Sequence, residues 1–249
     1  MAFDPSKYTV AAARPLPVIL LLDRSGSMGE IESGDVIPTG ETVVEDGQEY
    51  NIVTGGVSRI DILNQSVNEM IQSFKTVGRN EVEINVGVIS FGSSVNYDVP
   101  LKPARDINEM TCLDASGSTP MGTALRMAKD LIEDRDIIPS KGYRPMVILV
   151  SDGGPNDDWQ PAMEAFISEG RSSKCDRFAL AIGRDADRNV LKRFLAGTEN
   201  KLCEANDAAK IRNFFKFVTM TAEHKTLSAN PNLSLPPAEA QGMLDEMGF

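Results

Sequence analysis

The stretch that decides the fold is an apolar run that ends in one acid and two hydroxyls: Val18-Ile19-Leu20-Leu21-Leu22-Asp23-Arg24-Ser25-Gly26-Ser27-Met28. A short apolar run bounded by turn residues is typical of a strand buried on both faces of a parallel sheet. Ligands of such sheets bind at the carboxyl ends of the strands. Asp23, Ser25 and Ser27 follow that end directly. Their hard oxygen atoms suit Mg²⁺ or Mn²⁺ better than zinc.

Two later stretches combine with the first. A turn rich in Gly and Ser places Thr119 before a predicted helix, within residues 116–122. A second buried strand, residues 146–151, runs into Asp152 and Gly153. Together the three stretches resemble the metal-ion-dependent adhesion site of von Willebrand factor A (vWA) domains. Each stretch alone has a simpler explanation, because Asp, Ser and Thr also cap turns and helices.

The resemblance implies a metal site and a partner. It implies that Ser25 and Ser27 bind the metal directly, that Thr119 binds it directly in one state and through water in another, and that the two carboxylates act directly or through water. The implied metal is Mg²⁺, with Mn²⁺ or Ca²⁺ as alternatives, and a protein partner completes it with an Asp or Glu. Ser118 and Gly153 are expected to contact that partner. The metal-binding residues are then Asp23, Ser25, Ser27, Thr119 and Asp152.

The resemblance extends to a subtype. Residues 144–159 and 16–23 are similar to the TerY-type proteins of bacterial tellurium-resistance clusters. Those proteins carry Thr where this chain has Asn156. The similarity covers about residues 14–225 and implies an intracellular scaffold that works with a protein kinase and a metal-dependent Ser/Thr phosphatase in stress or defence clusters.

Composition narrows the class of protein. A length of 249 residues, with 41% hydrophobic and 24% charged, fits one soluble domain. The net charge of −11 argues against general affinity for nucleic acid or anionic membrane. No C-x-x-C pair is formed by Cys112, Cys175 and Cys203, which predicts reduced, buried thiols. The single histidine, His224, is expected to lie on the surface of a helix. The beginning of the chain shows no export signal and no run reaches about 20 apolar residues, so we expect a cytoplasmic protein.

The order of predicted elements gives the fold class and domain limits. Strands alternate with helices, which predicts an α/β, Rossmann-like doubly wound fold: a mostly parallel sheet, one antiparallel edge strand, and helices on both faces. We expect an N-terminal arm (1–14), a vWA domain (15–226) and a C-terminal tail (227–249) with a small helix near 238–247. Expected strands lie at 18–22, 82–91, 96–99, 146–151, 177–182 and 201–204. Expected helices lie at 58–74, 120–135, 161–170, 188–196 and 208–224.

An acidic insertion separates the first motif from its helix. Residues 30–57 carry seven acids and neither Lys nor Arg. They predict a hairpin closed at Asp46-Gly47, a dipeptide that accepts positive φ. Two interpretations stay open: a partner-recognition element, with Glu45 and Asp46 as contacts, or a solvated loop without function. Near the third motif, Asp157 and Asp158 are expected to cap the helix that follows them.

Three alternatives compete with a cytoplasmic interaction module. A haloacid-dehalogenase-type phosphatase would need a second acid two residues after Asp23, where Ser25 stands. No phosphate-cradling loop and no Gly-x-Ser-x-Gly elbow occur either, so we expect no enzyme. An extracellular adhesion protein would need an export signal and usually a disulfide. The serious alternative is a vWA subunit of an AAA+ ATPase complex in metal insertion or remodelling.

Overall fold

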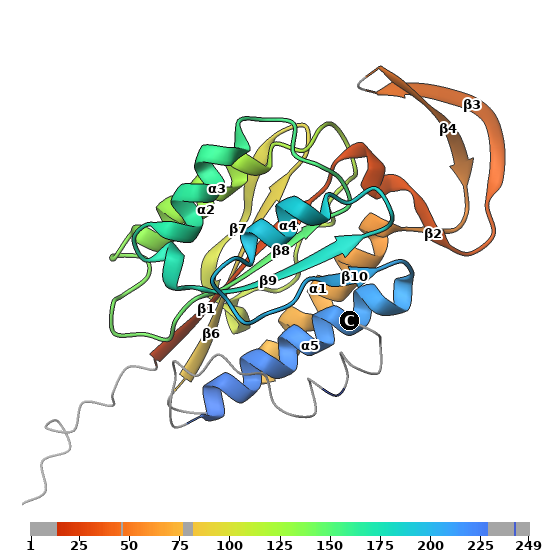
Figure 1. The fold of residues 1–249 in the computed structure, drawn as a ribbon. Helices are drawn as coiled ribbons and strands as arrows, with labels where there is room; N and C mark the ends of the chain where they lie inside the picture. Colours follow the sequence, from red (N-terminus) through yellow and green to blue (C-terminus); the bar gives the residue numbers. More distant parts are fainter. Residues whose placement is uncertain (1–13, 46, 77–81, 229–241, 243–249) are drawn as a thin grey trace, which may run out of the picture.

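A six-stranded sheet forms the centre of the computed structural model, which describes residues 14–45, 47–76, 82–228 and 242. The strand order is β10-β9-β8-β1-β6-β7, and β7 alone runs antiparallel to its neighbour (Figure 1). The bounds are β1 Arg14–Asp23, β6 Val82–Phe91, β7 Val95–Pro103, β8 Met146–Ser151, β9 Asp176–Ile182 and β10 Cys203–Ala205. The sheet is therefore mixed and mostly parallel, as predicted.

Helices cover both faces of the sheet. Side chains alternate along a strand, so Leu20 and Leu22 pack toward α1 and α5, while Ile19 and Leu21 pack toward the other layer. Every residue of β1 from Leu16 to Asp23 is buried. The helices are α1 Arg59–Thr76 and α5 Ala208–Leu227 on one face, and α2 Met121–Glu133, α3 Trp159–Ser168 and α4 Arg188–Phe194 on the other (Figure 1).

The helix starts explain where the connecting loops end. At α1, the hydroxyl of Ser58 accepts from the N–H of Asp61 at 3.2 Å, and Asp61 accepts from the N–H of Ser58 at 3.0 Å. This reciprocal capping box satisfies N–H groups that have no partner inside the helix. At α5, Asp207 accepts from the N–H of Lys210 at 2.8 Å. The described residues also include short 3-10 turns: η2 Gly26–Gly29, η3 Ala104–Asp106 and η4 Ser172–Lys174.

The insertion forms two small antiparallel pairs. At its base, β2 Ile31–Ser33 pairs with β5 Val57–Ser58, a pairing that the sequence did not predict. Beyond it, β3 Ile37–Glu45 pairs with β4 Gln48–Thr54, which confirms the predicted hairpin and lengthens it. Gly56 has φ +74°, and a Cβ there would lie 2.5 Å from Ile31 Cγ2, so glycine alone fits where the chain returns.

Two predictions about the body need correction, and two others concern residues outside the described ranges. The edge strand does not end at Pro100 but continues to Pro103. Its register shifts around Gly87, and the N–H of Leu101 donates to the Tyr97 hydroxyl at 2.6 Å instead of to a strand. Cys112 is exposed rather than buried, whereas Cys175 and Cys203 are buried. The arm before residue 14 and the predicted helix at 238–247 lie outside the described residues.

None of the helices among the described residues combines the length and apolarity that a membrane crossing requires. His224 is exposed on α5, as predicted.

Candidate functional site

Three loops meet at the carboxyl end of the sheet, and backbone hydrogen bonds join them. In the first, the N–H of Gly26 donates to the carbonyl of Gly117 at 2.9 Å, and the N–H of Ser116 donates back to the carbonyl of Arg24 at 2.8 Å. The third loop joins the second where the N–H of Asn156 donates to the carbonyl of Thr119 at 3.1 Å. The sequence-predicted residues of all three motifs are thereby brought together.

Asp23 lies at the bottom of the site and is fully buried. Its Oδ1 accepts from the N–H of Ser25 at 2.8 Å, and its Oδ2 accepts from the hydroxyl of Ser151 at 2.5 Å. Because β8 lies beside β1 in parallel register, Ser151 at the end of β8 reaches Asp23 at the end of β1. Both carboxylate oxygens are thus oriented by fixed donors.

The hydroxyls of the first loop connect Asp23 to the third loop. The Ser25 and Ser27 hydroxyl oxygens lie 3.2 Å apart, and the Ser27 hydroxyl donates to Asp152 Oδ1 at 2.8 Å. Ser25 and Asp152 are buried, with 3% and 1% of their surface exposed. Three oxygen atoms from two loops therefore face one another within hydrogen-bonding distance.

Arg59, the first residue of α1, contacts the other oxygen of Asp152. Its Nη1 donates to Asp152 Oδ2 at 3.1 Å, while Nε contacts Glu32 at 3.0 Å and Nη2 contacts Glu30 at 2.8 Å. Gly183 leaves room for the guanidinium, since a Cβ there would lie 2.8 Å from Nη2. Arg59 thus links the site to both acids at the start of the insertion.

Thr119 occupies the second loop, 7% exposed. The sequence left helix capping open as its role, but α2 has Pro120 at its N-cap position and no capping hydrogen bond from a side chain there. The N–H of Thr119 donates to Asn156 Oδ1 at 3.2 Å, so Asn156 holds this loop through its side chain and its backbone. A Cβ on Gly153 would lie 3.8 Å from the Thr119 hydroxyl.

Asp157 corrects one prediction about caps. It was expected to cap the helix after it, but it accepts from the N–H groups of Gly122 and Thr123 at 2.9 and 2.8 Å, and so it caps α2. Asp158 holds the N-cap position of α3 without a side-chain cap. The chain can pass this close to α2 because Gly122 has no Cβ. A Cβ there would lie 2.6 Å from Trp159 Cα. Asp157 therefore fastens the third loop to the second.

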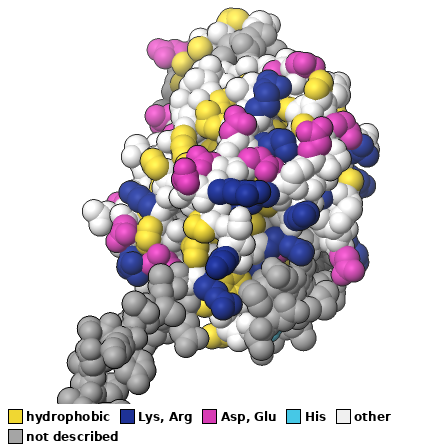
Figure 2. All heavy atoms as spheres, turned by 90° about the vertical axis from the view of Figure 1, so that its left-hand side faces the viewer, with side chains coloured by type: hydrophobic (Ala, Val, Ile, Leu, Met, Phe, Trp, Pro, Cys, Tyr) yellow, Lys and Arg dark blue, Asp and Glu magenta, His cyan; other side chains and the backbone are white. Residues whose placement is uncertain are grey.

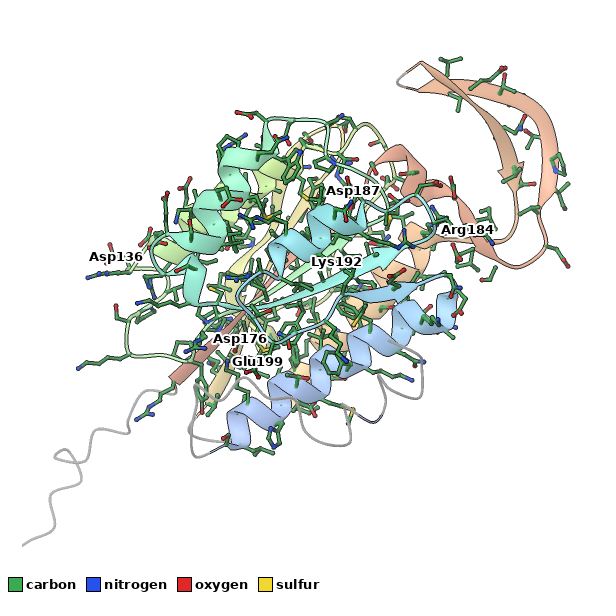
Figure 3. The ribbon with its side chains drawn as sticks, in the orientation of Figure 1. Asp136, Asp176, Arg184, Asp187, Lys192 and Glu199 are labelled. Carbon is green, nitrogen blue, oxygen red and sulfur yellow. The ribbon has the colours of Figure 1, made fainter. Side chains whose placement is uncertain are left out.

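The third loop also rests on the start of α4. The N–H of Asp187 donates to the carbonyl of Gly153 at 3.2 Å, and the Asp187 carboxylate accepts from Asn189 and Val190 as the cap of α4. Asp187 lies on the same side of the molecule as Arg184, away from Asp176 and Glu199 (Figure 3).

The site concentrates negative charge in a buried place. Burial raises the pKa of Asp23 from 3.8 to about 7, and the nearby Asp152 adds to this rise. Burial also raises the pKa of Asp152, although the hydrogen bond from Ser27 and the charge of Arg59 oppose it. Two carboxylates this close favour either a shared proton or a cation.

Not all predicted contact residues come together. Ser118 and Gly153 lie in the second and third loops, beside the candidate metal residues. Glu45 is the last residue of β3 and pairs with Gln48 at the tip of the hairpin, so it belongs to none of the three loops. Asp46 lies outside the described residues. Within the described ranges, no three His, Cys, Asp or Glu side chains come together as a metal-ligand cluster, so any metal here would rely on hydroxyls as well as carboxylates.

Comparison with known proteins identifies the family. The model of the von Willebrand factor type A domain matches residues 18–155, more than half of the chain, and includes all three loops. This chain belongs to the von Willebrand factor type A domain family. A search of curated proteins found no match.

Solved structures of other proteins share the fold. Proximal thread matrix protein 1 from the mussel byssus, with a zinc-occupied MIDAS motif, aligns with a TM-score of 0.55 at 17% identity, over 84% of this chain and 48% of that chain. A von Willebrand factor type A protein from Catenulispora acidiphila aligns at 0.54 and 19% identity, over 85% and 43%. The PilB minor pilin from Streptococcus sanguinis aligns at 0.55 and 16%, over 90% and 65%. This chain therefore spans about half to two thirds of the length of these proteins.

Two residues of the site were missed in the sequence. Ser151 could have been found, because it ends the strand whose next residue is Asp152 and whose neighbour is β1. Arg59 gave no local signal, since a basic residue in the first turn of a helix is unfavourable for the helix dipole. Its role depends on Glu30, Glu32 and Asp152, which the fold brings together.

Proposed function

We propose that the three loops bind a divalent cation, Mg²⁺ with Mn²⁺ or Ca²⁺ as alternatives, and that the cation binds an acidic side chain of a protein partner. One observation carries the proposal: the 3.2 Å between the Ser25 and Ser27 hydroxyl oxygens and the 2.8 Å between Ser27 and Asp152. Neighbouring ligand oxygens of an octahedral Mg²⁺ lie about 3.0 Å apart, given Mg–O distances of about 2.1 Å.

The donor set supports the second half of the proposal. Ser25, Ser27 and Thr119 are neutral donors, and Arg59 already neutralises part of Asp152. A dication held this way keeps much of its charge, and Mg²⁺ gives up its last waters reluctantly. A carboxylate from a partner is therefore a favourable further ligand. The zinc-occupied MIDAS motif of the mussel protein adds support for a divalent cation in this fold.

The test of the metal is thermal melting of the whole chain in Mg²⁺, Mn²⁺ or EDTA. A cation that binds only the native state adds about 2.7 kcal/mol at 100 times its dissociation constant. We expect this gain in the wild type and none in Asp23→Ala. Asp185→Ala, an exposed acid at the same end of the sheet, is the matched control and keeps the gain. Retained metal-dependent stabilisation in Asp23→Ala would contradict the site.

Thr119→Ala tests the second loop. Because Asp157 caps α2, loss of the Thr119 hydroxyl should leave the melting temperature in EDTA nearly unchanged. Affinity for Mn²⁺, measured by calorimetric titration, should fall about tenfold or more. A fall in stability without any change in Mn²⁺ affinity would show that Thr119 has a structural role only.

At a finer level, we propose a non-enzymatic cytoplasmic scaffold of the TerY type, working with a kinase and a phosphatase in a bacterial stress or defence cluster. The support is the similarity of residues 144–159 and 16–23, which includes Asp157, the residue that fastens the third loop to the second. Asn156 departs from that type, because those proteins carry Thr at this position. The alternative is a subunit of an AAA+ ATPase complex. Binding of the purified chain to the kinase, phosphatase or ATPase encoded beside its gene, with and without Mg²⁺, separates the two.

A further inference from the structure

The hairpin (β3 and β4) extends from the body, and no other described element lies beside it. Figure 1 shows it apart from the sheet and helices, and in Figure 3 its side chains point into open space. Val43 and Val44 are 47% and 68% exposed. Successive side chains of a strand point to opposite faces, so both faces of the hairpin carry exposed apolar groups. Ile37 and Ile52 add to this surface, at 66% and 37% exposed.

The outer edge of β4 is open to a further strand. Within the described residues, β4 pairs with β3 alone. The edge of β3 is interrupted by Pro38 and by a register shift between Pro38 and Thr42, which are ordinary protections of an edge. β4 contains neither Pro nor Lys. Glu45 pairs with Gln48, and strand ends that are separated by two residues form a hydrogen-bonded pair. By alternation, the N–H groups of Glu49 and Asn51 point to the open edge.

The charge of the insertion is of one sign. Residues 30–57 hold seven acids and no Lys or Arg. Glu30 and Glu32 pair with Arg59, and the sequence of the insertion holds five further acids: Asp35, Glu41, Glu45, Asp46 and Glu49. On the face of the body shown in Figure 2, by contrast, basic and acidic side chains are interspersed and hydrophobic ones form small separate groups.

We propose that the open edge of β4 docks an extended segment of a partner protein in which Lys or Arg alternates with apolar residues. Strand addition would supply main-chain hydrogen bonds for affinity, and alternate side chains would supply specificity. A two-stranded hairpin is marginally stable alone, and a third strand completes a stable sheet. The acidic and apolar composition selects a basic, apolar strand by charge complementarity. A second copy of this chain would bring like charges together.

The test uses a fluorescent peptide of alternating Lys and Val with blocked ends, added to the full chain and followed by anisotropy. We expect binding that weakens between about 0.05 and 0.5 M salt, since charge attraction is screened. A peptide of alternating Glu and Val should not bind. Equal binding of the two peptides, or no binding of the basic one, would overturn the proposal. Dimers of the unmodified chain in light scattering that the peptide fails to dissociate would also overturn it.

Two sets of variants separate strand addition from general charge attraction. The double variant Glu41→Lys/Glu49→Lys should lower affinity about tenfold or more, whereas Asp136→Lys/Asp185→Lys, with the same charge change on the body, should bind as the wild type does. Asn51→Pro removes one outward N–H and should abolish binding, and Val44→Ser should weaken it without a change in charge. Equal loss in both double variants, or full binding by Asn51→Pro and Val44→Ser, would contradict docking at β4.

This inference does not rest on the proposed metal site. The peptide should bind equally in Mg²⁺ and EDTA, and equally to Asp23→Ala. The metal proposal can therefore fail in the melting experiment while peptide binding holds, and the reverse outcome is equally distinguishable.

Discussion

The metal loops and the hairpin differ in how the fold holds them. The loops lie at the end of a buried sheet, and hydrogen bonds from three segments fix Asp23, Ser27 and Asp152 in place. The hairpin is held by the pairing of its own two strands and, where it joins the body, by the pairing of β2 with β5. Preorganised groups suit a small ion with strict geometry, whereas an exposed edge suits a partner that supplies part of the structure itself. The difference teaches that one chain can combine a rigidly held cluster of oxygen atoms with an exposed strand edge.

The largest expected effect is a loss of stability that follows the ionisation of Asp23 in the loops. The pKa of Asp23 is raised from 3.8 to about 7, so the native state holds a proton that the unfolded chain releases. The stability that this proton provides is present below about pH 4 and is lost as pH rises to about 7, a change on the order of 4 kcal/mol at about 1.4 per pKa unit.

Urea unfolding of the wild type in EDTA, compared with Asp23→Asn across this range, measures that loss. The variant has no such carboxylate, so the difference in unfolding free energy between the two proteins should change with pH. Mg²⁺ should reduce the loss in the wild type. A constant difference from pH 4 to 8 would show that Asp23 stays ionised throughout.

A glycine exchange compares the two regions directly. Gly117 and Gly40 both have positive φ, +75° and +81°, but a Cβ at Gly117 would lie 2.4 Å from backbone atoms of Ser93, whereas nothing lies within 4 Å at Gly40. Gly40→Ala should cost about 1 kcal/mol of strain. Gly117→Ala should cost about 3 kcal/mol, because overpacking adds to that strain. Equal losses in urea unfolding would mean that the second loop moves as freely as the hairpin.

Arg59→Leu tests the connection between the regions. Removing a hydrogen-bonded charge beside Asp152 should cost about 2 kcal/mol in EDTA, and less in Mg²⁺ because the metal then compensates the carboxylates. Arg24→Leu is the control, since Arg24 contacts hydroxyl and carbonyl oxygens of the loops but no carboxylate in the described contacts. The stability that Arg24→Leu loses should be the same in EDTA and in Mg²⁺. An equal loss in both conditions for Arg59→Leu would show that Arg59 has no influence on metal binding.

The smallest effect is expected where the hairpin is removed. Replacing residues 34–56 by Asn-Gly would close β2 onto β5 with a two-residue turn. Because the hairpin packs against no other element in Figure 1, the unfolding free energy should change by less than about 1 kcal/mol. The metal-dependent gain in melting temperature should persist. A larger loss would show that the hairpin supports the body.

The sequence predicted best those elements whose own residues indicate whether they are buried or exposed. The strand at 146–151 agrees with β8 to the residue, because a fully buried strand reads as a continuous apolar run. The three motifs predicted the residues that the loops bring together, since parallel strands end at one edge of the sheet. The hairpin was readable from Asp46-Gly47 and the alternating residues around it.

What the sequence did not reveal depends on contacts between distant segments. Asp157 lies two residues before α3 but caps α2, because the chain passes over the second loop first. Pro100 suggested the end of a strand. The register shift leaves position 100 of this edge strand without a partner in the sheet, so the missing N–H of proline costs no hydrogen bond there. Ser151 and Arg59 became part of the site only through the positions of β8 and α1.

The pairing of Ser33 with Val57 at the base of the insertion has one more consequence. The chain leaves the body and returns at neighbouring points, so a segment of any length can be accommodated there, and each doubling of a flexible segment costs only about 0.6 kcal/mol in closure entropy. The insertion is in this sense an exchangeable cassette. Under the two proposals above, related proteins could exchange the docking hairpin while keeping the metal loops unchanged, and a designer could graft a new hairpin at the same two residues.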